Sequence, residues 1–76
     1  MSYLEPLFIY LNHHRDEIYF LSFDEISVIV HRELCKSAKQ YKLYWYSKNI
    51  LFLQKLYRIK IESVSPVTMG VYFDYI

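Results

Sequence analysis

The sequence has 76 residues and a mass of 9.4 kDa, of which 54% are hydrophobic and 20% aromatic, and its net charge is +1. This length supports one hydrophobic core, so we expect a single domain over residues 1–76, and the composition excludes an intrinsically disordered tail. Charged residues interrupt every long apolar stretch, which excludes a membrane-spanning helix. The single Cys35 excludes an internal disulfide, and with no signal-peptide pattern at the start it favours a reducing cytoplasm.

The first half of the chain predicts a helix, a short strand and a second helix. Apolar residues at positions 4, 7, 8 and 11 have helical spacing, and Pro6 suits a first turn, so we expect a helix over residues 4–12. Residues 18–21 are β-branched and aromatic, which is typical of a strand. Ser22 and Glu25 have the spacing of a capping box, so a second helix begins there and is expected to end near His31.

The next stretch predicts further helical structure. Ser37 and Gln40 have the spacing of a second capping box, which predicts a third helix with positions 38, 41 and 45 on its apolar stripe. Residues 47–49 bend or break this helix. Positions 50, 53, 56 and 57 then form another helical stripe, and the pattern leaves open whether the two helices are continuous.

The last part of the chain predicts a hairpin. Residues 59–62 alternate with period two, Ser65-Pro66 marks a turn, and residues 67–73 have the character of a returning strand. The order of elements is therefore helix, strand, helix, one or two helices, strand, strand. This is the order of a winged helix-turn-helix, so we expect a compact α+β domain of that kind. It would have three to four helices and a small antiparallel sheet that ends in the C-terminal hairpin.

Three stretches of the sequence belong to one recognisable pattern. They are Tyr3-x-x-Pro6-Leu7-x-x-Tyr10-Leu11, Leu21-Ser22-Phe23-x-Glu25-Ile26-x-x-Ile29, and Ser37-Ala38 followed by Tyr44-Trp45. Together they resemble a small, uncharacterised bacterial domain family of unknown function, whose pattern is Y-x-x-P-L-x-x-Y-L, L-S-F-x-E-I and S-A followed by W-W. The resemblance spans nearly the whole chain. It implies the compact fold described above and no established activity.

The charges are segregated along the chain. Residues 1–33 hold two arginines and six acidic residues, a net charge of −4, whereas residues 34–61 hold seven basic residues and no acidic one, a net charge of +7. Residues 62–76 have a net charge of −2. Because tyrosines and a tryptophan interrupt the basic stretch, it has the character of a surface that binds a polyanion. Solvating lysines on helix faces and tyrosines in the core account for the same pattern without any ligand.

The winged helix-turn-helix order places nucleic-acid recognition after the second helix, so we expect the binding residues there and in the flanking basic positions. The candidate nucleic-acid-binding residues are Lys36, Ser37, Lys39, Gln40, Lys42, Tyr44, Tyr46, Lys48, Arg58 and Lys60. Gln40 has an alternative role as a capping residue. Trp45 is expected to anchor the core, with stacking on a base as the alternative.

No pattern indicates catalysis, a metal or a cofactor. His13 and His14 are adjacent, so their side chains diverge, and no ligand spacing accompanies them. Cys35 has no recognisable catalytic partner, and we expect a buried structural thiol. The carboxylate pairs at 16–17 and 24–25 are explained by a solvated turn and by a helix N-terminus.

Two functions therefore remain open for a non-enzymatic protein. The first is a small regulatory protein that binds nucleic acid, duplex DNA in particular, through its basic and aromatic central segment, as a homodimer or beside a larger partner. The second is a protein-interaction module, such as an inhibitor or accessory factor from a phage or another mobile element. In that case tyrosines on its surface would anchor a protein partner.

Overall fold

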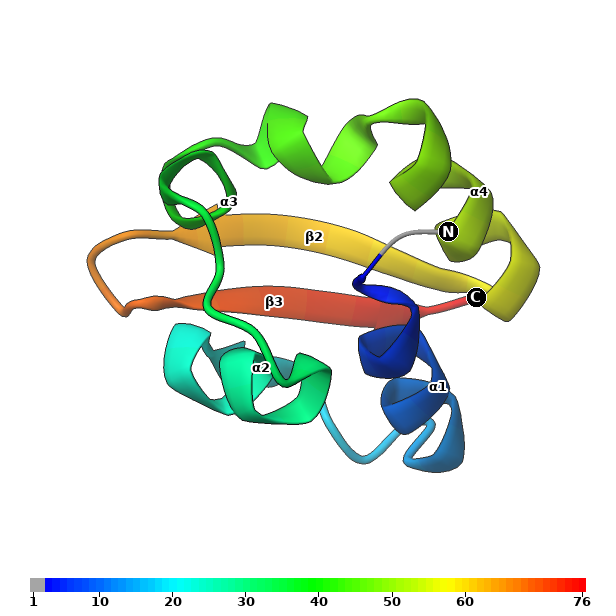
Figure 1. The fold of residues 1–76 in the computed structure, drawn as a ribbon. Helices are drawn as coiled ribbons and strands as arrows, with labels where there is room; N and C mark the ends of the chain where they lie inside the picture. The colour runs from blue at the N-terminus through cyan, green and yellow to red at the C-terminus, as the bar shows by residue number, and fades with distance from the viewer. Residues whose placement is uncertain (1–2) are drawn as a thin grey trace.

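Helices cover a small antiparallel sheet in the computed structural model, which describes residues 3–76 (Figure 1). The elements in chain order are α1 (Glu5–His13), β1 (Phe20–Ser22), α2 (Phe23–Val30), α3 (Lys36–Gln40), the 3-10 helix η1 (Lys42–Tyr46), α4 (Lys48–Tyr57), β2 (Ile59–Ser65) and β3 (Gly70–Tyr75). The predicted α+β class is confirmed, with its small sheet and C-terminal hairpin. The architecture is consistent with a winged helix-turn-helix-like fold.

The sheet has the strand order β1-β3-β2, so the last strand lies between the other two. Leu21 pairs with Val71 and Ile61 with Phe73, and these four side chains are buried on one face of the sheet. A register shift between Ile61 and Ser63 marks a bulge in β2. The structure thus has one buried sheet face, and the alternating positions of β2 and β3 are exposed on the other.

The core lies between this sheet face and the helices. Its buried apolar residues come from every helix and strand, and they are Leu4, Leu7, Phe8, Leu11, Leu21, Phe23, Ile26, Val30, Leu34, Ala38, Trp45, Ile50, Leu53, Ile59, Ile61, Val71 and Phe73. The expected role of Trp45 as a core anchor is confirmed, because its side chain is fully buried. Its Nε1 donates a hydrogen bond of 3.0 Å to the carbonyl oxygen of Ala38.

Helix α2 begins and ends as predicted. Ser22 Oγ accepts from the Glu25 amide at 3.1 Å, and Glu25 Oε1 accepts from the Ser22 amide at 2.9 Å, which completes the capping box. The helix ends at His31, whose backbone is left-handed with φ 56 and whose amide donates to carbonyls of the last turn. These local signals fix α2 without help from the rest of the fold.

The prediction for the third helix was wrong in two respects. Helix α3 begins at Lys36 with Cys35 as its N-cap and no side-chain capping bond, so Ser37 and Gln40 do not form a capping box. The helix also ends at Gln40, because Tyr41 is extended with φ −122 and ψ 123. Tyr41 is therefore 59% exposed rather than part of a buried stripe, and η1 returns the chain so that Trp45 still reaches the core.

The sequence left open whether the helices on either side of residues 47–49 are continuous, and the structure shows that they are not, so α4 is a separate helix. Ser47 is extended, with φ −62 and ψ 156, between η1 and α4. Within α4 the buried residues are Ile50, Leu53 and Gln54, and Leu56 is exposed. The predicted apolar stripe was therefore wrong at position 56, because the buried face continues through the polar Gln54.

The strand boundaries differ from those predicted. β1 begins at Phe20 rather than at residue 18, and β2 continues to Ser65 rather than ending at residue 62. The returning strand begins at Gly70 and not at residue 67, because Met69 has a left-handed backbone with φ 55 that still belongs to the turn.

Candidate nucleic-acid interface

Three of the candidate lysines lie on the outer surfaces of α3, η1 and α4, and the structure adds a fourth lysine that was not predicted, Lys55. Lys36, Lys42 and Lys48 are exposed, and so is Lys55 on the last turn of α4. Within residues 3–76, none of these four ammonium groups forms an ion pair with a carboxylate. Lys42 Nζ lies 5.5 Å from the ring centroid of Tyr46. This cation–π contact orients the Lys42 side chain and leaves its positive charge in place. We call these four lysines the basic surface.

Two other candidate lysines have acidic partners. Lys39 Nζ lies 3.6 Å from Glu33 Oε1, and Lys60 Nζ lies 3.4 Å from Glu62 Oε1. Lys60 also stands at an exposed position of β2, in register with Asp74 on the outer face of the sheet. The structure therefore separates these two residues electrostatically from the basic surface, although exposed ion pairs of this kind are weak and exchange readily.

The remaining polar candidates are exposed. Ser37 and Gln40 lie on the outer side of α3. Arg58 ends α4 in a left-handed conformation with φ 57, and its side chain is exposed beyond the last turn.

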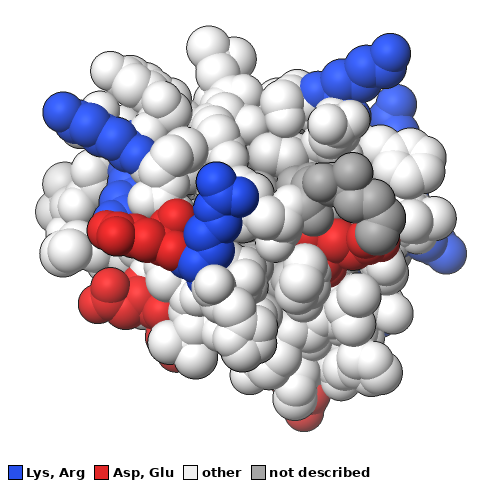
Figure 2. Space-filling model, viewed as in Figure 1, with Lys and Arg blue, Asp and Glu red and all other residues white. Residues whose placement is uncertain are grey.

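The segregation of charge along the chain becomes a segregation in space. In Figure 2 most of the basic side chains project from the upper part and right edge of the molecule, where α3, η1 and α4 lie in Figure 1. Acidic side chains occupy the middle and lower parts of the same view. Uncharged atoms separate the basic groups, so this face offers spaced cations rather than one dense patch.

The two candidate tyrosines, Tyr44 and Tyr46, are half-buried and engaged in the fold. Tyr44 Oη and Tyr3 Oη lie 3.0 Å apart in a hydrogen bond, and burial raises the pKa of the Tyr44 phenol well above its ordinary value. Tyr46 donates to the carbonyl oxygen of Ile61 at 2.8 Å. The rings that face solvent beside the lysines belong instead to Tyr41 and, on α4, to Phe52, which is 64% exposed.

Sequence reasoning missed most of the outer face of α4. Lys48, Phe52 and Leu56 are spaced four residues apart and are all exposed, with Lys55 beside them. The signal that would have found this face is the spacing 50, 53, 54 and 57, which is a regular helical stripe if Gln54 is counted as a core residue. The predicted stripe included Leu56 in place of Gln54, so it placed the buried face of α4 partly on the side that is exposed.

Gln54 anchors the basic surface to the sheet. Its Nε2 donates to the carbonyl oxygen of Trp45 at 2.7 Å, and its Oε1 accepts from the amide of Ile61 at 3.3 Å. Tyr46 bonds the carbonyl oxygen of the same Ile61. Since β2 is an outer strand, these side chains satisfy backbone groups that would otherwise be open at the sheet edge. They also hold η1 and α4 in one orientation.

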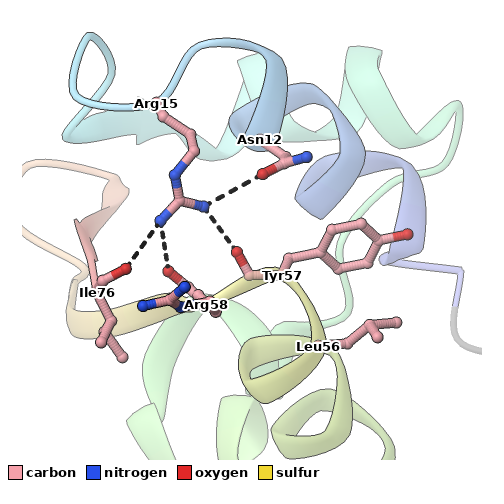
Figure 3. Close-up of a pocket in the computed structure, with 6 residues that line it drawn as sticks. All are labelled: Asn12, Arg15, Leu56, Tyr57, Arg58 and Ile76. Carbon is pink, nitrogen blue, oxygen red and sulfur yellow. Dashed lines mark hydrogen bonds between the residues drawn. The ribbon is translucent and has the colours of Figure 1, made fainter.

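The pocket beside the end of α4 is a structural site (Figure 3). Arg15 donates to the carbonyl oxygens of Tyr57 at 2.7 Å, Arg58 at 3.1 Å and Ile76 at 3.1 Å, and to Asn12 Oδ1 at 3.2 Å. Both terminal nitrogens of its guanidinium are thus committed to the protein. Arg15 ties the C-terminal carbonyls of α4 to the end of β3, and it has little capacity left for an anionic ligand.

Of the residues considered for catalysis or metal binding, His14 and Glu17 are neighbours, with His14 Nδ1 3.5 Å from Glu17 Oε1 on the surface. Among the residues that the structure describes, no three His, Cys, Asp or Glu side chains are placed to share a metal ion. Cys35 is exposed at the start of α3, so the expectation of a buried thiol was wrong; the extended N-cap position turns it outward. No helix within residues 3–76 is both long and apolar enough to cross a membrane.

Comparison with known proteins gives no guide to function. No family model, curated protein or solved structure matches this chain at a significant level.

Proposed function

We propose that this protein binds nucleic acid, duplex DNA in particular, through the basic surface on α3, η1 and α4. The observation that carries the proposal is the set of four exposed lysines, Lys36, Lys42, Lys48 and Lys55, without carboxylate partners in residues 3–76. A duplex attracts such groups because each neutralised phosphate releases a condensed counterion. Most acidic side chains lie in the middle and lower parts of Figure 2, and those at its left lie directly beside basic side chains, as Glu33 does beside Lys39. The acidic groups therefore border the basic surface at α3.

Helix α4 is the element we assign to the groove of the duplex. It immediately precedes the hairpin, as the second helix of the helix-turn-helix does in a winged domain. Its first turn exposes Lys48 and Asn49, which suit a phosphate and a base edge respectively. The hairpin turn would play a lesser part, since residues 65–69 contain no basic side chain.

The test is fluorescence anisotropy of a labelled duplex of about 20 base pairs at 50 and 200 mM NaCl. We expect micromolar binding at the lower salt. Four phosphate contacts predict a loss of affinity of about 150-fold between the two salt concentrations. Absence of binding at 50 mM, or binding that does not depend on salt, would refute the proposal.

A pair of charge reversals locates the interface. Lys48→Glu is expected to lower the slope of log affinity against log salt by about one unit or more, because it removes a phosphate contact. Arg32→Glu makes the same change in net charge, but in the acidic part of the chain, and it should alter binding less than about twofold. Equal losses for the two variants would show that only net charge matters and would remove α4 from the interface.

A second candidate function, protein interaction, is favoured by apolar side chains among the lysines. Leu43 is 82% exposed, and Phe52 and Leu56 are exposed on α4. Phe52 and Leu56 are four residues apart on one face of the helix, and neighbouring exposed apolar groups of this kind are typical of protein interfaces. An inhibitor or accessory factor from a phage or mobile element would use them as anchors, in a reducing cytoplasm where Cys35 stays a thiol. This candidate takes the lead if DNA is not bound at 50 mM salt.

A further inference from the structure

Helix α2 presents an apolar residue at the centre of its solvent-facing side. Val28 is 72% exposed, while Phe23, Ile26 and Val30 on the opposite side are buried. A β-branched residue at an exposed helical position is a poor helix former, so helix stability gives no reason for it. A contact with another molecule does give a reason.

A groove runs beside Val28, between α1 and α2. Ile9 and Tyr10 of α1 and Ile29 of α2 line it, and Ile9 and Tyr10 are themselves exposed. A second hollow, which extends to Leu21 and Glu25, is also lined by Val28, Tyr10 and Ile29. Val28 therefore stands at the rim of both hollows, so this surface carries an exposed apolar side chain next to a largely apolar recess.

The polar groups along the exposed side of α2 also complement one another, because the Asp24 carboxylate accepts hydrogen bonds and the His31 imidazole donates one. Asp24 precedes Val28 by four residues on the same side of the helix, and His31 is the C-cap residue three positions after Val28. Both Asp24 and His31 are exposed. If two copies of α2 cross antiparallel about Val28, Asp24 of each copy lies opposite His31 of the other.

We propose that the α1–α2 face binds a second copy of this chain in a two-fold symmetric dimer. Val28 of each copy enters the groove formed by Ile9, Tyr10 and Ile29 of the other, and the antiparallel α2 helices pair Asp24 with His31. A two-fold interface requires one patch to complement itself, which this face does in shape and in its hydrogen-bonding groups. The proposal is independent of nucleic-acid binding, because none of its residues belongs to the basic surface.

Sedimentation equilibrium of the full chain from about 1 to 500 µM tests the dimer. We expect a monomer–dimer equilibrium in the wild-type protein, and Val28→Asp should raise the dimer dissociation constant at least about 100-fold, since the change occurs twice in one interface. Val67→Asp is the matched control: Val67 is 92% exposed at the hairpin turn, and its replacement should leave the constant within about twofold. Circular dichroism verifies that both variants fold.

A charge exchange tests the antiparallel arrangement. Asp24→Lys should weaken the dimer, and Asp24→Lys combined with His31→Asp should restore it, because the pair is then reversed; Asp tolerates the left-handed backbone at position 31. A wild-type protein that stays monomeric at 500 µM would overturn the proposal. So would a dimer that Val28→Asp leaves intact, or one that the double exchange fails to restore.

Discussion

The side chain of Gln54 on α4 forms hydrogen bonds to η1 and β2, and the stability that is lost when these bonds are removed can be estimated. Gln54→Leu keeps a similar volume but leaves the carbonyl oxygen of Trp45 and the amide of Ile61 without their partners in a buried region. Each unsatisfied buried backbone group costs about 1–3 kcal/mol, so for two groups the free energy of unfolding should fall by about 2–6 kcal/mol. A domain of this length is expected to have about 4–11 kcal/mol in total, so the loss is large.

Urea unfolding followed by the fluorescence of Trp45 measures this loss. Gln40→Leu is the matched control, because Gln40 is exposed on α3, and the same substitution there should change the free energy of unfolding by less than about 0.5 kcal/mol. If Gln54→Leu costs less than about 1 kcal/mol, water or a backbone shift satisfies both groups. Gln54 would then not be the anchor of η1 and α4.

Two further predictions concern the stability of the fold. A Cβ at Gly70 would lie 2.2 Å from Phe20 Cζ and 2.6 Å from the carbonyl oxygen of Leu21, so Gly70→Ala should lower the free energy of unfolding by about 1–3 kcal/mol in urea titration. A loss below about 0.5 kcal/mol would contradict this packing. Burial raises the pKa of Tyr44, so the folded state holds the phenol proton more tightly than the unfolded chain, where tyrosine titrates near pH 10. Stability present at pH 8 should therefore decline above about pH 10, and Tyr44→Phe should reduce that decline; an identical decline in the variant would refute the assignment.

The sequence predicts best what short-range interactions determine. The box of Ser22 and Glu25 fixes α2 because both partners lie within one turn, and no distant contact has to be known. The order of elements follows from the alternation of periodic stretches, which is why the fold class was predicted correctly. These signals are carried by neighbouring residues.

What the sequence does not predict depends on contacts between distant residues. Ser37 and Gln40 have the same spacing as the box at Ser22, yet α3 begins elsewhere and its chain turns at Tyr41 so that Trp45 can bond Ala38 in the core. The outer face of α4 was predicted wrongly because Gln54 is polar, and the spacing of apolar residues does not reveal its hydrogen-bond partners in η1 and β2. A polar residue with two buried partners acts as a core residue, and no local pattern reveals it.

The positions of α2 and α4 decide how the two proposed surfaces would work together. Helix α2 packs beside β1 and helix α4 beside β2, and these strands are the opposite edges of the sheet. A dimer formed through the α1–α2 face therefore leaves both α4 helices outside its interface. Since one copy extends 25 Å, the whole dimer is about 50 Å long. Half-sites one helical turn apart are separated by roughly 34–36 Å, which lies within this length, so the dimer is large enough for both α4 helices to reach one duplex.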